Sequence, residues 1–208
     1  MAETTHLLQV ARWAQEFLTL PHPELGRGGQ VCPYVRGSIR ERGLLLALLE
    51  GADTPQTDQT LLRLGQYFLQ LEPTEPSLSQ RKAIVVLFPG LGERETADAI
   101  NGMHQRLKPH FLSQGMMLGE FYAHSQKPGL HNPEFRPLRS DTPLLVIRIM
   151  VLTDIAFLTD EVAFVRAFLR NFKAQGREEL RRYVERRRDA LGAGLSSMLL
   201  EEAARSEA

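Results

Sequence analysis

The stretch Lys82-Ala-Ile-Val-Val-Leu-Phe88 is the clearest strand in the sequence. Every residue after Lys82 is apolar, and two are β-branched valines, so the pattern predicts a central strand covered on both faces. Pro89-Gly90 ends the strand. Residues 93–113 follow as a predicted helix. The acidic residues in its first turn interact favourably with the positive end of the helix dipole.

Three further stretches predict the remaining strands of one sheet. Residues 115–123 and 144–151 are suited to pair as a wide hairpin, and residues 43–49 form a short leucine run after a glycine. Helical spacing of apolar residues predicts helices over residues 4–19, 57–71, 159–174 and 177–191. This order predicts an α+β fold (mixed α/β), with a small four-stranded mixed sheet packed with about five helices.

The size and composition are those of an ordinary globular protein. Hydrophobic residues make up 43% of the 208 residues, which suits a single globular domain over residues 1–192 and a C-terminal tail, residues 193–208, that frays. The 25 basic and 25 acidic residues balance, so there is no global electrostatic case for nucleic acid. No apolar run approaches the ~20 residues that span a membrane. The single cysteine, Cys32, and the absence of a signal peptide favour the cytoplasm.

Several familiar enzyme motifs are missing from the sequence. There is no glycine-rich phosphate loop ending in Lys-Ser or Lys-Thr, and no Gly-x-Ser-x-Gly nucleophile turn. There is also no pair of histidines four residues apart that would hold zinc on a helix. A less conspicuous chemistry has to be sought from individual residues.

His104 is the first candidate. It shares one apolar face of the predicted helix with Ile100, Leu107 and Phe111. A buried imidazole needs a hydrogen-bond partner or a metal, and a backbone carbonyl is the commoner solution. The alternative is an axial ligand to haem iron, which requires one histidine that projects from a helix into an apolar cavity.

The second candidate is the loop of residues 124–139, which begins at His124 and contains His131, Arg136 and Arg139. The loop is either an ordered surface loop or a site for an anion, since guanidinium groups form charge-assisted hydrogen bonds to carboxylates. Arg148 interrupts the apolar strand that follows. A buried charge needs a partner, and Glu120 on the preceding strand is a candidate.

Two other features receive the more ordinary interpretation. Cys32 lies in a loop as Cys32-Pro33-Tyr34 and is either a small apolar filler, a nucleophile or a thiolate ligand. Residues 177–188 mix arginine with glutamate at helical spacing, which is typical of a solvated helix face.

The chain resembles a bacterial domain family of unknown function. The resemblance rests on the strings Val31-Cys-Pro-Tyr-Val35, Gly115-Met-Met-Leu-Gly-Glu-Phe121 and Gly129-Leu-His-Asn-Pro-Glu-Phe-Arg-Pro-Leu-Arg139, and covers about residues 17–158. More distantly, the layout is similar to small haem-dependent N-hydroxylases. The shared features are a cysteine-containing loop, the strand Val85-Val-Leu-Phe88 and a helix that carries Met103-His104.

This distant resemblance implies a small haem-binding oxygenase that acts on an amine or amino-acid-like substrate. His104 would be the axial ligand, with His131 as the second choice, while arginines of the loop would bind propionates or a substrate carboxylate. The competing hypothesis is a non-catalytic module that binds a small molecule or peptide through residues 124–139. A hydrolase or transferase that depends on Cys32 is a weaker third hypothesis. We expect no nucleic-acid or membrane partner, and a homodimer is left open.

Overall fold

The computed structural model describes residues 2–50 and 54–206. Contacts divide the chain into two compact units, unit 1 with residues 1–108 and 117–149, and unit 2 with residues 109–116 and 150–208. The elements run in the order α1 (Ala2–Trp13), η1 (Ala14–Leu18), η2 (Pro23–Leu25), α2 (Val35–Arg40), β1 (Leu44–Leu48), α3 (Pro55–Gln70), α4 (Pro76–Ser79), β2 (Ala83–Leu87), α5 (Glu93–Ser113), β3 (Met116–Phe121), β4 (Leu144–Ile149), η3 (Leu152–Phe157) and α6 (Val162–Arg205).

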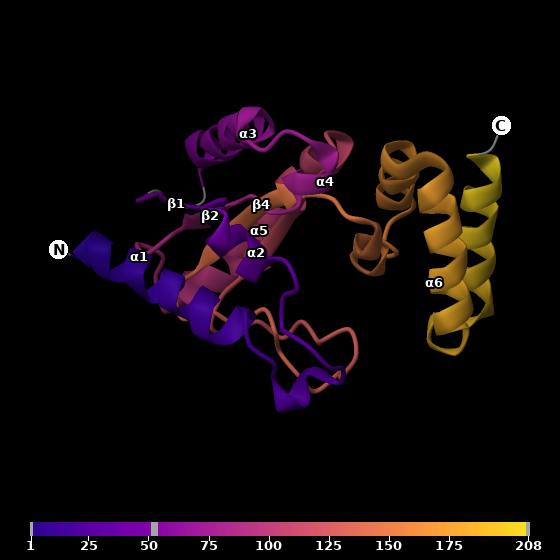
Figure 1. Ribbon diagram of the computed structural model, residues 1–208, viewed down its shortest axis with the longest axis horizontal. Helices are drawn as coiled ribbons and strands as arrows, with labels where there is room; N and C mark the ends of the chain where they lie inside the picture. Colours follow the sequence, from indigo (N-terminus) through magenta and orange to yellow (C-terminus); the bar gives the residue numbers. More distant parts are fainter. Residues whose placement is uncertain (1, 51–53, 207–208) are drawn as a thin grey trace. The chain divides into compact units, whose positions relative to one another are not determined.

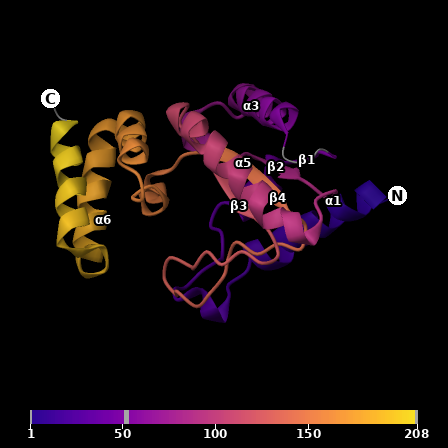
Figure 2. The same cartoon turned by 180° about the vertical axis from the view of Figure 1, so that it is seen from behind.

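The sheet is four-stranded and mixed, in the order β1-β2-β4-β3 (Figures 1 and 2). β1 pairs with β2 in parallel, and β2 pairs with β4 antiparallel. All five residues of β2 are buried, as expected for the central strand. The predicted α+β class is confirmed, and so is the pairing of the last two strands, because β4 and β3 are neighbours.

The two faces of β2 are covered by different helices. Val85 and Leu87 pack with Val10 of α1, and Trp13 lies against the same cluster. Alternate residues of a strand point to opposite faces, so Ile84 and Val86 face away from α1. α5 crosses that opposite face (Figure 2). The sheet therefore sits between α1 and α5, and the loops at the ends of its strands carry the site.

Unit 2 contains the whole of α6, in which two breaks separate three helical segments. Lys173 and Gly192 have non-helical backbone angles, and Gly192 has a φ of 74°, a conformation that glycine adopts without strain. The second and third segments lie side by side as a hairpin (Figure 1). Arg166 of the first segment donates two hydrogen bonds of 2.8 Å to the buried Glu202 of the third.

The C-terminal segment differs from the frayed tail predicted for residues 193–208, of which the last two lie outside the described residues. Helix continues after the break at Gly192 as far as Arg205. Leu199 and Ala203 are fully buried there. An apolar face was therefore hidden in a stretch that composition alone marked as polar and small. None of the helices in the described part of the chain is long and apolar enough to cross a membrane.

Candidate functional site

Two loops of unit 1, far apart in sequence, pack against each other at one end of the sheet. The side-chain amide of Asn132 donates a 2.8 Å hydrogen bond to the carbonyl of Glu24. Gly26 has a φ of 75°, and a Cβ there would lie 2.7 Å from the carbonyl oxygen of His131. Only glycine fits this contact, since an L side chain would meet both backbone strain and a backbone clash.

Internal hydrogen bonds hold the second loop in shape. The Gly129 amide donates to the carbonyl of Phe135 at 2.8 Å, and the Tyr122 amide donates to the carbonyl of Leu138 at 3.3 Å. Arg139 donates from Nε to the carbonyl of Ser125 at 3.2 Å. Phe135 is only 5% exposed. The ring of Phe135 therefore packs inside the loop, and hydrogen bonds hold the two ends of the loop together.

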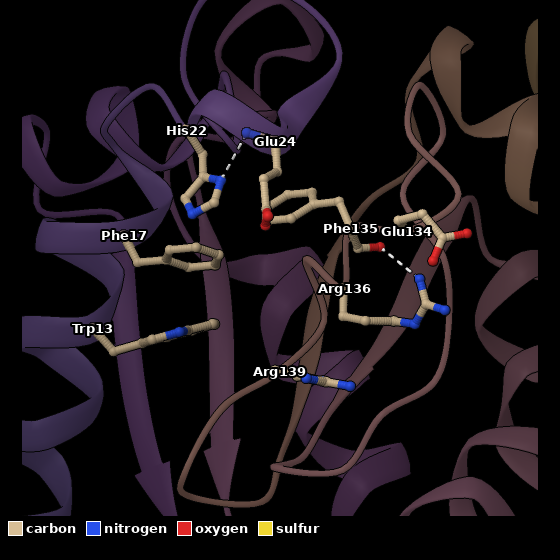
Figure 3. Close-up of a pocket in the computed structure, with 8 residues that line it drawn as sticks. All are labelled: Trp13, Phe17, His22, Glu24, Glu134, Phe135, Arg136 and Arg139. Atoms are coloured by element: carbon tan, nitrogen blue, oxygen red, sulfur yellow. Dashed lines mark hydrogen bonds between the residues drawn. The ribbon is translucent and has the colours of Figure 1, made fainter.

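The two loops and the end of the N-terminal helix line a pocket of about 390 Å³ that is open to solvent (Figure 3). A wall of four rings lines one part of it. His22 stacks on Phe135 with centroids 4.6 Å apart, and Trp13 stacks on Phe17 at 6.2 Å. The full lining comprises Trp13, Phe17, His22, Glu24, Glu134, Phe135, Arg136 and Arg139.

Acidic and basic side chains both line this pocket, and the two arginines are held by hydrogen bonds to backbone carbonyls. Arg136 donates from one terminal nitrogen to the carbonyls of Pro133 and Phe135. Within the described residues, Arg139 donates a hydrogen bond from Nε to the carbonyl of Ser125. Each guanidinium carries five N–H donors in a planar fork, so both retain donors for a ligand. Such a fork matches the two oxygens of a carboxylate, and the ring wall offers flat apolar area beside it.

His104 occupies a separate buried cluster of unit 1. The residue is 7% exposed, and its Nε2 lies 3.0 Å from the carbonyl oxygen of Leu118 and 2.8 Å from a carboxylate oxygen of Glu120. Lys127 pairs with the same carboxylate, which is itself buried. Both neighbours of Nε2 are acceptors, so Nε2 carries the hydrogen.

Burial lowers the pKa of His104 from 6.5 to about 3, and the charges of Lys127 and Lys108 act in the same direction. The carbonyl of Leu118 opposes the shift. Glu120 also favours an imidazolium, but Lys127 already balances that carboxylate, so the cost of burying a second cation prevails. His104 is therefore neutral at physiological pH.

This geometry bears on the predicted haem ligand. Iron coordination needs an unprotonated ring nitrogen that faces a cavity, whereas Nε2 of His104 donates to its two neighbours. Nε2 is therefore unavailable to iron, and a ligand role would fall to Nδ1, which carries no hydrogen in this tautomer. Across residues 2–50 and 54–206, no group of three histidine, cysteine or acidic residues is placed to hold a metal ion. Haem coordination by His104 stays a prediction.

The family model described as a domain of unknown function (DUF6875) matches residues 7–183. The chain belongs to this family. The expected resemblance to a family of unknown function is thus confirmed, over a longer stretch than residues 17–158. No curated protein and no solved structure significantly matches the chain.

The match to the DUF6875 model covers the whole pocket, but the predicted site residues are only partly brought together. Arg136 and Arg139 line the pocket. His131 contributes its backbone to the contact with Gly26, and Cys32 is half-buried with its amide bonded to Leu18. Arg148 donates to the carbonyl of Ile149, while its expected partner Glu120 contacts His104 and Lys127.

Sequence reasoning missed most of the pocket wall in this DUF6875 chain. Phe17 falls within the helix predicted over residues 4–19, and the sequence singles out none of Trp13, His22 and Glu24. The signal that could have identified these residues lies in their local sequence. Trp13 and Phe17 are four residues apart, so they lie on the same side of a helix, and a proline on each side of His22 marks the turn that follows.

Proposed function

We propose that this DUF6875 domain is a non-catalytic binding module that captures a small molecule with a carboxylate and a flat apolar part. The observation that supports this function is the placement of Arg136 and Arg139, with donors to spare, beside a wall of stacked rings in one pocket. A volume of about 390 Å³ suits a small molecule.

The strength of binding follows from the openness of the pocket. A bidentate guanidinium–carboxylate pair and a stacked ring each contribute modestly while solvent still reaches the ligand. Part of that gain is offset by the freedom that the ligand loses. We therefore expect a Kd of roughly 10 µM to 1 mM for a simple aromatic carboxylate.

Replacement of Arg139 by alanine tests the proposal. We expect Arg139→Ala to weaken binding of 3-phenylpropionate by about tenfold or more, because a charge-assisted hydrogen bond contributes about 1.5–3 kcal/mol. Trp13 is the only tryptophan of the chain and lines the pocket, so its fluorescence reports occupancy. Arg94→Ala is the control, since Arg94 is an exposed residue outside the pocket lining. Equal affinity of wild type and Arg139→Ala would contradict the proposal.

Haem-dependent hydroxylation of an amine or amino-acid-like substrate is the competing proposal. It rests on the distant resemblance and on the burial of His104 on an apolar helix face. An absorption spectrum after addition of hemin separates the two. A strong Soret band, lost in His104→Ala and kept in the exposed variant His110→Ala, would favour the oxygenase. We expect no such band.

A further inference from the structure

The pocket lining holds opposite charges that do not neutralise one another. Glu24 and Glu134 lie in the same lining as Arg136 and Arg139. Throughout the part of the chain that the structure describes, no ion pair within 4 Å joins either carboxylate to either guanidinium. Instead, each arginine donates to backbone carbonyls of its own loop. The pocket thus presents separate anionic and cationic groups.

The backbone that carries Glu24 is fixed from two sides. Its amide donates to Nδ1 of His22 at 3.2 Å, and its carbonyl accepts from Asn132 at 2.8 Å. Arg139 is likewise anchored through Nε. Each charged group is therefore presented from a braced position on a different loop. Figure 3 shows Glu24 near the His22 turn and Arg139 across the pocket from it.

A ligand with only an anionic group would satisfy the arginines and leave a carboxylate of the pocket facing another negative charge. A ligand that also carries an ammonium group would pair with both signs. The rings in the same lining, His22 stacked on Phe135 and Trp13 stacked on Phe17, suit a planar substituent. The arrangement of the charges and the wall of rings together favour a molecule with an anionic group, an ammonium group and a planar ring.

We infer that the pocket takes an aromatic zwitterion, a molecule with a carboxylate, an ammonium group and an aryl ring, as in an aromatic amino acid. This inference rests on the proposed binding function. Arg139 binds the carboxylate, Glu24 binds the ammonium group, and the ring wall holds the aryl group. Glu24 is the specificity-determining residue, because it distinguishes the zwitterion from a plain carboxylate.

Three probes that differ only in their charged groups test this assignment. L-phenylalanine has both groups, 3-phenylpropionate has only the carboxylate, and 2-phenylethylamine has only the ammonium. Each is titrated into the full chain with Trp13 fluorescence as readout. We expect L-phenylalanine to bind about tenfold more tightly than either single-charge probe. Glu24→Gln should abolish that preference, so that L-phenylalanine and 3-phenylpropionate bind this variant with equal affinity.

Glu95→Gln is the matched control, since Glu95 is exposed in α5 and outside the pocket, and it should keep the preference. Binding of 3-phenylpropionate as tight as that of L-phenylalanine would overturn the zwitterion assignment and leave the binding function standing. A preference that survives in Glu24→Gln would overturn the role of Glu24. Absence of binding by all three probes would instead overturn the proposed function itself.

Discussion

The free energy of unfolding is expected to fall by about 2 kcal/mol between pH 7 and pH 5, because of His104. Burial lowers the folded-state pKa of His104 from 6.5 to about 3. Between pH 3 and pH 6.5, His104 is protonated in the unfolded chain but not in the folded protein. The free energy of unfolding therefore rises with pH in this range. The stability that depends on a neutral His104 is fully present above pH 6.5 and is lost as the pH falls toward 3.

Urea denaturation at the two pH values measures this effect. In His104→Gln the side-chain amide keeps a donor for Leu118 but does not titrate, so the variant should lose most of the pH dependence. His110→Gln, a change at an exposed position of the same helix, should behave as the wild type. A wild-type stability that increases as the pH falls below 6.5 would show that Glu120 dominates and that His104 is charged.

Replacement of Phe135 by alanine is expected to cost about 3 kcal/mol of stability and to abolish ligand binding. The ring is 5% exposed and stacks on His22 at 4.6 Å. Its loss leaves a cavity under the second loop and removes half of the stacked wall. Urea denaturation gives the stability, and Trp13 fluorescence with 3-phenylpropionate gives the binding.

Phe135→Leu separates these two effects. Leucine fills much of the volume, so the expected loss of stability is below about 1.5 kcal/mol. It has no flat face to stack on His22 or on a ligand ring, so binding should still weaken severalfold. If Phe135→Leu bound the probe as tightly as the wild type, the ring wall would have no part in recognition.

The elements of the sheet were the most predictable part of the fold. The strand predicted over residues 82–88 is found as Ala83–Leu87, and the helix predicted over residues 93–113 is found as Glu93–Ser113. Both have a strong apolar period, because each packs a continuous face on the core. The burial of His104 follows from the same period. The short helix Val35–Arg40 was missed, since it has too few residues for a period to show.

The pocket was predictable only in part. Arg136 and Arg139 stood out, because charged donors in a long loop suggest a ligand. The other half of the site comes from residues that pack against that loop in space. A packing contact such as Gly26 on His131 leaves no sign in either stretch when each is read alone. The contacts of Glu120, suggested as the partner of Arg148, illustrate the same point, because Glu120 lies against His104 and Lys127, which come from other parts of the chain.

The hydrogen bond from Asn132 to Glu24 joins residues 108 positions apart. Contacts with such a separation are slow to form, because a long chain must be ordered before they contribute any free energy. The pocket is thus complete only in the folded protein, and the unfolded chain has nothing comparable to offer a ligand. Occupancy is therefore coupled to folding. A ligand at one hundred times its Kd would add about 2.7 kcal/mol to the stability of the native state, and the melting temperature would rise with its concentration.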